Sequence, residues 1–354
     1  MNKRSTILIA GFGSIGRRHF RNLQSLGFRD LAVLRTGKSV LPTAELSDTP
    51  VYYHLEAALA EKPLAVIVAN PTALHIPVAL AAARAGCHLF IEKPLSDRRE
   101  GLEELGRLIS RENLTAQSGF QLRFHPGLQQ VRQWLSEGLI GEVVSVDAHY
   151  GEFLPGWHPW EDYRESYSAR ATLGGGVVLT LCHPFDYLEW LLGPVAGVFA
   201  LTARRSGLGI EVEDTAQILL RFASGVIGHL NLDYVQQPPS HGFRIVGQQG
   251  TIEWHYHDGH AGCYEAPKKR WHTFHLPEKF HRNQLYLAEM RAFLEAVFSG
   301  GRPESDFRAG TRALELALAV KESAAAGQLV NLDKNPGGPE IPVLSHNSLQ
   351  PNQG

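Results

Sequence analysis

The chain is poor in cysteine: only three occur among its 354 residues, and they lie far apart, at Cys87, Cys182 and Cys263. An odd number of widely spaced cysteines argues against a disulfide framework and favours a reducing compartment, so we expect a cytoplasmic protein. We expect neither a secretory leader nor a membrane-spanning segment, because no apolar run is long enough to span a bilayer. The formal net charge is −2 without any block of basic residues, so we expect neither nucleic acid nor a membrane as a partner.

Three closely spaced glycines near the start of the chain indicate a binding site. An apolar run at residues 6–10 leads directly into Gly11, Phe12, Gly13, Ser14, Ile15 and Gly16, and a helical pattern follows. In a G-x-G-x-x-G sequence the first glycine permits a tight turn, the second lets a pyrophosphate approach the backbone, and the third lets helix and strand pack closely. The helix N-terminus adds free N–H groups for the phosphates. We therefore expect a dinucleotide site; a glycine-rich turn without a ligand is the alternative.

The order of the predicted elements indicates two domains. Residues 1–121 alternate strands (near 6–11, 30–35, 51–53, 64–69, 88–92 and 115–120) with helices (near 15–26, 55–61, 73–85 and 97–111). This alternation predicts an α/β domain with a doubly wound parallel sheet. Residues 122–330 carry helices near 126–137, 177–192, 281–298 and 306–326, with strand-like runs near 142–149, 196–204, 214–222, 226–235, 243–246 and 250–256. They predict a second α/β domain with a mostly antiparallel sheet. Residues 331–354 are expected to form a loose tail.

A lysine follows another apolar strand of the first domain. Glu92, Lys93 and Pro94 come directly after residues 88–91, at the edge where ligands bind in open α/β sheets. Desolvation in a dry cleft would lower the proton affinity of the Lys93 ammonium, which could then polarise a reacting oxygen or relay its proton. A surface lysine paired with Glu92 is the alternative.

These motifs resemble those of the Gfo/Idh/MocA family of oxidoreductases. The resemblance rests on the glycine motif, Asn70-Pro71 with His75, Glu92-Lys93-Pro94, residues 119–124, the triple glycine at 174–176, His183-Pro184-Phe185-Asp186 and residues 247–252. It implies an N-terminal Rossmann domain and a C-terminal α/β domain whose open sheet carries the substrate site and often an oligomer interface, so we expect a homodimer or homotetramer. It also implies NAD or NADP as cofactor and a sugar, cyclitol or sugar derivative as substrate.

Within this resemblance, Lys93 and His183 are the expected catalytic residues. Asp186 lies three residues after His183 on the same helix face, where it would fix the tautomer of the histidine or bind a substrate hydroxyl. Many family members carry an acidic residue one turn before this histidine. Here Thr180 stands in the corresponding place and cannot act as an acid or base at neutral pH, so the proton assignment between Lys93 and His183 stays open. A helix histidine capped by its neighbours is the alternative.

Other polar and aromatic residues are candidates for the substrate side. Gln121 and Arg123 follow the last strand of the first domain, where they either line the cleft or form interdomain hydrogen bonds. Trp157 and Tyr167 belong to an aromatic stretch that suits a sugar-stacking lid, or a packed interface loop equally well. The histidines of residues 255–260 suggest a metal site, but the Asp-Gly pair among them favours a hairpin turn, so no metal is expected.

The end of the second strand bears on cofactor preference. An NAD-specific Rossmann domain usually has Asp or Glu there to bind the ribose hydroxyls. This chain has Arg35, Thr36 and Lys38 instead, which favours NADP over NAD. The full set expected to bind the cofactor comprises the six residues of the glycine motif, Arg35, Thr36, Lys38, Asn70, Pro71, His75, Glu92 and Lys93.

The expected function is therefore hydride transfer between a nicotinamide and a hydroxyl or keto carbon of a sugar-like substrate. Two alternatives remain open. One is redox-assisted elimination or hydrolysis with a recycled, bound cofactor. The other is a non-catalytic cofactor-sensing regulator, since fold alone does not determine function.

Overall fold

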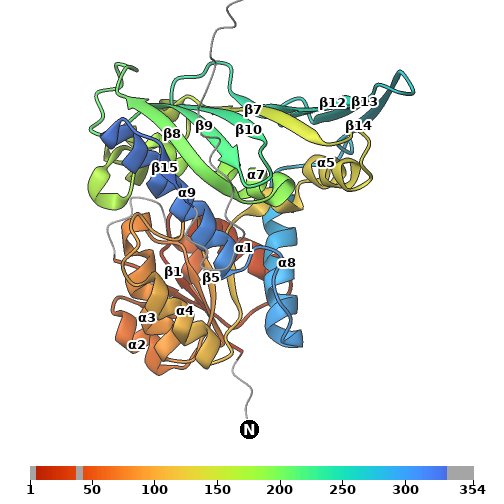
Figure 1. Ribbon diagram of the computed structural model, residues 1–354. Helices are drawn as coiled ribbons and strands as arrows, with labels where there is room; N and C mark the ends of the chain where they lie inside the picture. Colours follow the sequence, from red (N-terminus) through yellow and green to blue (C-terminus); the bar gives the residue numbers. More distant parts are fainter. Residues whose placement is uncertain (1–4, 37–42, 333–354) are drawn as a thin grey trace, which may run out of the picture.

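Two β-sheets organise the molecule. The computed structural model describes residues 5–36 and 43–332, and it places one sheet in each half of the chain (Figure 1). The first sheet has six parallel strands in the order β3-β2-β1-β4-β5-β6. Its strands are β1 (Ile7–Ala10), β2 (Leu31–Leu34), β3 (Val51–Tyr52), β4 (Ala65–Val68), β5 (His88–Ile91) and β6 (Ala116–Ser118), connected by α1 (Ser14–Ser25), α2 (Leu55–Ala60), α3 (His75–Arg84) and α4 (Leu102–Arg111).

The sequence of the central strands explains this sheet. Every residue of β1 and of β4 is buried, as expected for strands covered by helices on both faces. Because all strands are parallel, their carboxyl ends meet at one edge of the sheet. The strand order reverses between β1 and β4, and in open α/β sheets the ligand crevice lies at such a reversal. The predicted α/β fold is confirmed.

The second sheet has nine strands in the order β14-β13-β12-β11-β7-β10-β9-β8-β15, and only the β7–β10 pair is parallel. The strands are β7 (Val143–Gly151), β8 (Val195–Ala203), β9 (Thr215–Phe222), β10 (Ile227–Asp233), β11 (Ser240–Gly247), β12 (Gly250–His255), β13 (His260–Glu265), β14 (Arg270–His275) and β15 (Val330–Asn331). The helices of this half are α5 (Pro126–Ser136), α6 (Val177–Thr180), α7 (His183–Leu192), α8 (Asn283–Ser299) and α9 (Phe307–Ala326). Figure 1 shows α5, α7, α8 and α9 on the side of this sheet that faces the first domain.

Two sequence-based predictions were wrong in this half. The single helix expected after the triple glycine is split into α6 and α7, which are separated by Leu181 and Cys182. Pro184 lies in the first turn of α7, where its missing N–H costs nothing; inside a continuous helix it would remove a hydrogen bond. Strands β13 and β14 were not predicted. β14 is rich in polar and charged residues, and β13 has only small residues at its buried centre, so the hydrophobic pattern of each is weak.

The two halves share a hydrophobic core. Met290, Phe293 and Leu294 of α8 are buried in a cluster with strand residues of the first sheet and with Phe20 of α1. Helix α8 therefore covers the first domain although it comes late in the chain. The boundary expected at residue 121 stays a prediction. No helix in the described part is both long enough and apolar enough to cross a bilayer.

Candidate active site

The glycine turn between β1 and α1 has the geometry of a phosphate cradle. Gly11 has φ +105°, and a Cβ atom there would lie 2.6 Å from the carbonyl oxygen of Ala69. A Cβ atom at Gly16 would lie 2.0 Å from the carbonyl oxygen of Gly11, so both positions require glycine. Gly13 differs, because a Cβ atom there would meet nothing within 4 Å. Open space therefore lies beside the one glycine whose backbone is expected to face the pyrophosphate.

The start of α1 leaves its N–H groups available. Gly13 is the N-cap, and no side chain caps the helix, so the amides of the first turn, including those of Ser14 and Ile15, are free for an anion. Phe12 is buried against Phe20, with the ring centroids 5.6 Å apart, and holds the turn on the core. The residues present thus fit a dinucleotide pyrophosphate.

The end of β2 offers basic and hydroxyl groups. Arg35 is half-buried, and it lines a cavity of about 240 Å³ together with Thr43, Ser47 and Tyr53. Nε of Arg35 is buried without a hydrogen-bond partner among the described residues. Thr36 is exposed next to it. Lys38 lies outside the described residues.

His75 joins two loops at the ligand-binding edge. Its ring Nε2 lies 2.8 Å from the carbonyl oxygen of Asn70, and Nδ1 lies 2.9 Å from that of Pro94. The side chain is almost fully buried, so its role in the structure is to hold the loops after β4 and β5 together. Pro71 starts the short 3₁₀ turn that leads into α3, and the Asn70 amide donates to the carbonyl of Leu74.

Glu92 turns away from the edge into the domain. Its carboxylate lies 2.6 Å from Nε2 of His19, a fully buried residue of α1. It also accepts a hydrogen bond from the backbone N–H of Lys93. Burial raises the pKa of this carboxyl, but the contacts with His19 and Lys93 outweigh that effect and lower it. Glu92 thus ties β5 to the helix of the glycine turn.

Lys93 and His183 come together from the two halves of the chain. The Lys93 ammonium donates to the backbone carbonyl of Thr180, 2.9 Å away, at the end of α6. His183 begins α7 three residues later, and its Nε2 lies 3.2 Å from the amide nitrogen of Gln121. The same amide nitrogen lies 3.3 Å from the hydroxyl of Tyr286 on α8. Lys93 thus lies against the end of α6, just before the helix that His183 begins, and Gln121 contacts His183; a catalytic role for these residues stays a prediction.

The protonation states differ from what the sequence suggested. Burial, together with the positive charges of Lys93 and Arg282, lowers the pKa of His183 well below 6.5, so the imidazole is neutral at pH 7. Burial also tends to lower the pKa of Lys93, but Tyr167, Cys182 and Glu92 outweigh it, and the pKa is raised. The expectation that desolvation weakens the proton affinity of Lys93 was therefore wrong, because that argument left out neighbours that favour the cation.

Asp186 does not contact the histidine. Its carboxylate receives three hydrogen bonds from the Arg123 guanidinium, at 2.7, 3.0 and 3.1 Å, and both side chains are buried or nearly so. Arg123 also donates to the carbonyl of Glu304. The partners of Arg123 lie within residues 122–330, as Arg123 itself does, so these contacts are not the interdomain hydrogen bonds weighed as an alternative. Asp186 is committed to this pair and does not fix the tautomer of His183.

Two family models match the chain. The oxidoreductase family with an NAD-binding Rossmann fold matches residues 5–120, and the GFO/IDH/MocA C-terminal domain matches residues 128–253. The chain belongs to the Gfo/Idh/MocA family. It is thus an oxidoreductase with an NAD-binding domain, as the sequence predicted.

Individual relatives are distant. An uncharacterized oxidoreductase of Synechocystis sp. is 32% identical over 217 residues, and the match covers 57% of each chain, little more than half of that relative. The 1,5-anhydro-D-fructose reductase of Ensifer adhaerens is 27% identical over 282 residues, which are 76% of this chain and 80% of that one. Among solved structures, levoglucosan dehydrogenase in complex with NADH and levoglucosan has a TM-score of 0.82 at 19% identity, covering 94% of this chain and 100% of that one. This likeness shows the shared fold.

In this Gfo/Idh/MocA protein, the two aromatic residues predicted to form a lid, Trp157 and Tyr167, have different surroundings. Trp157 packs edge-on against Tyr234, with the ring centroids 5.7 Å apart, which fits a packed loop. Tyr167 is half-buried, and it is among the neighbours that raise the pKa of Lys93, so it lies near the cleft. Arg164 and Arg170 of the same stretch are paired with Asp162 and Glu165. The lid function of Trp157 and Tyr167 stays a prediction.

Several residues of the second sheet were missed by sequence reasoning. Tyr150 of β7 stacks on His241 of β11, with the centroids 3.8 Å apart, and Tyr256 lies next to His241 at 5.5 Å. Arg282 and Tyr286 approach the same cluster from the start of α8. The strand alternation puts Tyr150 on the inner face, but no local pattern shows that β7, β11, the end of β12 and the start of α8 come together here.

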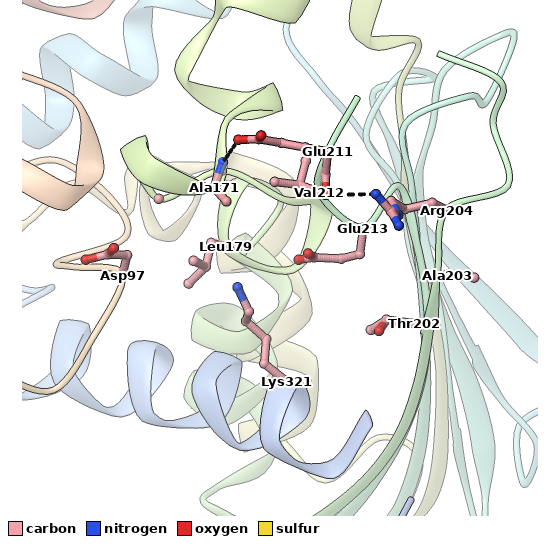
Figure 2. Close-up of a pocket in the computed structure, with 12 residues that line it drawn as sticks. Asp97, Ala171, Leu179, Thr202, Ala203, Arg204, Glu211, Val212, Glu213 and Lys321 are labelled. Atoms are coloured by element: carbon pink, nitrogen blue, oxygen red, sulfur yellow. Dashed lines mark hydrogen bonds between the residues drawn. The ribbon is translucent and has the colours of Figure 1, made fainter. Parts of the chain in front are cut away.

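Two other features lie outside this site. Residues 255–260 form the predicted hairpin between β12 and β13, and no group of three or more potential metal ligands occurs in the described part of the chain. A cavity of about 420 Å³ opens between α9 and β8, and Figure 2 shows the Lys321 ammonium pointing into it beside Glu213. This cavity is lined by neither Lys93 nor His183, so it is distinct from the candidate active site.

Proposed function

We propose that the chain transfers a hydride between NAD(P) and a hydroxyl or keto carbon of a sugar, cyclitol or sugar derivative. One observation carries the proposal: a cationic Lys93 and a neutral His183 meet at the edge of the Rossmann sheet that also holds the glycine turn. The names of two relatives, a 1,5-anhydro-D-fructose reductase and a levoglucosan dehydrogenase, support a sugar-like substrate.

The bound cofactor supplies the hydride acceptor or donor, and the side chains manage the proton. In the oxidative direction the neutral His183 accepts the hydroxyl proton at Nε2, because the Gln121 amide donates to that nitrogen and the single proton of the imidazole therefore lies on Nδ1. Lys93 keeps its proton and donates a hydrogen bond to the reacting oxygen. Gln121 orients the imidazole through Nε2.

For the cofactor, we propose a preference for NADP. Arg35 would pair with the 2′-phosphate, because the end of β2 carries no carboxylate to bind ribose hydroxyls. Dissociation constants of NAD and NADP test this. Arg35→Asp should weaken NADP and spare NAD, and a strong preference of the wild type for NAD would contradict it.

We further propose that the chain forms a homodimer or homotetramer through the outer face of the second sheet. Leu201, Leu219 and Ile227, on β8, β9 and β10, are 61%, 51% and 63% exposed there. In Figure 1 no labelled helix covers this face. Neighbouring exposed aliphatic side chains of this kind are typical of protein contacts.

A turnover assay tests the proposed function. Purified protein is incubated with NAD or NADP and a panel of sugars and cyclitols, and the absorbance of the reduced nicotinamide is followed. Lys93→Met and His183→Ala should each lower kcat by about a hundredfold to ten-thousandfold. The control is Lys321→Met, in the other cavity, which should retain the wild-type rate. Product formation without any reduced cofactor would instead indicate the redox-neutral elimination.

A further inference from the structure

Arg282 holds an unpaired positive charge beside the catalytic cleft. It is the N-cap residue of α8, and its side chain is solvent-exposed. Its guanidinium makes no hydrogen bond and no ion pair with any residue in the described part of the chain. A guanidinium carries five N–H donors in a planar fork, so this group has binding capacity that the protein itself does not use.

The other arginines close to the cleft are already engaged. Arg123 is paired with Asp186, and Arg164 and Arg170 are paired with carboxylates of their own loop. Arg18 lies over the ring of Tyr286, 4.4 Å from its centroid. Of these arginines, Arg282 is thus the one whose guanidinium contacts neither a carboxylate nor an aromatic ring in the described part of the chain.

The surroundings of Arg282 are polar and come from separate segments. Tyr286 lies one helical turn further along α8, and Tyr256 and Tyr150 come from the second sheet. Glu152 is the one carboxylate in the group, and it accepts a hydrogen bond from the hydroxyl of Tyr150 at 3.3 Å. Tyr286, Tyr256, Tyr150 and Glu152 all favour the cationic form of Arg282 and raise its pKa. The guanidinium therefore lies among hydroxyl groups without direct neutralisation.

A chain of contacts connects this group to the catalytic pair. The Tyr286 hydroxyl lies 3.3 Å from Nε2 of Gln121, and Nε2 of Gln121 lies 3.2 Å from Nε2 of His183. Tyr286 also acts electrostatically on both Lys93 and Arg282. A substrate whose reacting carbon lies at His183 would therefore extend toward Arg282. With Lys93 and Arg282 cationic and Glu152 the opposing charge, the unpaired charges at this end of the cleft sum to a positive value.

We propose that Arg282 binds a carboxylate group of the substrate, so that the enzyme prefers sugar acids such as hexuronates over neutral sugars. The inference rests on the proposed function for its reacting end. A planar guanidinium can hold a carboxylate through two parallel hydrogen bonds, which neutral hydroxyls cannot reproduce. The tyrosine hydroxyls and Glu152 would bind the remaining sugar hydroxyls, and Glu152 would accept hydrogen bonds from them.

The test compares matched pairs of ligands. D-glucuronate, D-galacturonate and D-mannuronate, each with its parent hexose, are titrated calorimetrically into the full chain loaded with reduced cofactor. We expect at least one hexuronate to bind about tenfold or more tightly than its hexose. Arg282→Gln should weaken that hexuronate by about 10- to 100-fold and change the hexose by less than about threefold. Arg282→Lys should retain part of the preference, and the matched control Arg164→Gln should bind as the wild type does.

Each outcome separates the two proposals. Equal binding of every hexuronate and its hexose by the wild type, or an equal loss of both in Arg282→Gln, overturns the role of Arg282. Hydride transfer is followed in parallel with the oxidised cofactor. Binding of a hexuronate that depends on Arg282 but yields no reduced nicotinamide with any sugar would leave Arg282 assigned and contradict the proposed function. Turnover of neutral sugars without any preference for acids would support the proposed function and contradict the role of Arg282.

Discussion

At the scale of single residues, the structure gives Lys93 and His183 different protonation states, which the sequence could not assign. His183 is buried between cations and stays neutral, whereas Lys93 has neighbours that keep it protonated. A neutral imidazole can accept a proton and an ammonium can donate a hydrogen bond, so we propose different tasks for the two residues. This difference supports the proposal that His183, and not Lys93, acts as the base.

This arrangement predicts the pH dependence of activity. Because His183 must be neutral and its pKa lies well below 6.5, kcat/KM should stay high as the pH falls to 6.5 and decline only below it. The Lys93 charge helps to lower that pKa, so Lys93→Met should move the decline to higher pH as well as lowering kcat. The measurement is the pH profile of kcat/KM, supported by an NMR titration of the His183 ring. An unchanged profile in Lys93→Met would show that the two groups do not interact.

A second residue-scale prediction concerns Glu289. It is fully buried on α8, neither carboxylate oxygen has a hydrogen-bond partner among the described residues, and burial raises its pKa well above 4.5. Above about pH 4.5 the unfolded state loses this proton while the folded state keeps it, so the free energy of unfolding falls by about 1.4 kcal/mol per pH unit until the folded pKa is reached.

Glu289→Gln removes this titration. The free energy of unfolding of the variant, relative to the wild type, should therefore increase between about pH 5 and pH 8. Urea unfolding at both pH values measures it. The control is Glu295→Gln, an exposed glutamate of the same helix, which should show no such trend. The absence of this trend in Glu289→Gln would mean that Glu289 is ionised in the folded protein.

At the scale of elements, the turn between β1 and α1 separates structural from binding glycines. Gly16 packs against backbone, whereas Gly13 faces open space. Gly13→Val should therefore fold normally and lose cofactor affinity by at least about tenfold, or about 1.4 kcal/mol. Gly16→Val should fail to fold stably, because the new side chain meets the carbonyl of Gly11. Circular dichroism and cofactor titration test the pair, and a folded Gly13→Val protein with unchanged affinity would place the cofactor elsewhere.

At the scale of the whole molecule, the proposed assembly uses the outer face of the second sheet. If copies associate there, replacing Leu219 and Ile227 by aspartate should bury charges in the contact and dissociate the oligomer. Sedimentation should then give the mass of one chain, with an unchanged circular dichroism spectrum. Leu329→Asp, at an exposed leucine in the segment after α9, is the control and should leave the mass unchanged. A monomeric wild type, or a mass unaffected by the double change, would exclude this face.

The sequence by itself determined the features that depend on neighbouring residues. The all-apolar β1 and β4, the glycine turn with its obligatory Gly11 and Gly16, and the lysine after β5 are local patterns, so the parallel sheet and its ligand edge followed from them. The wrong prediction of one helix instead of α6 and α7 also has a local cause. Pro184 lies at the start of α7, but the hydrophobic pattern of the two helices reads as one helix and hides the break.

Only the tertiary structure decided which charged groups meet. Asp186 could have contacted His183 on its own helix, yet Arg123 from 63 positions earlier in the chain binds it. The pKa of Lys93 depends on Tyr167 and Cys182, and the surroundings of Arg282 on β7 and the end of β12. Electrostatic and hydrogen-bond energies depend on distances in space and on burial, and both are set by the packing of segments far apart in the chain.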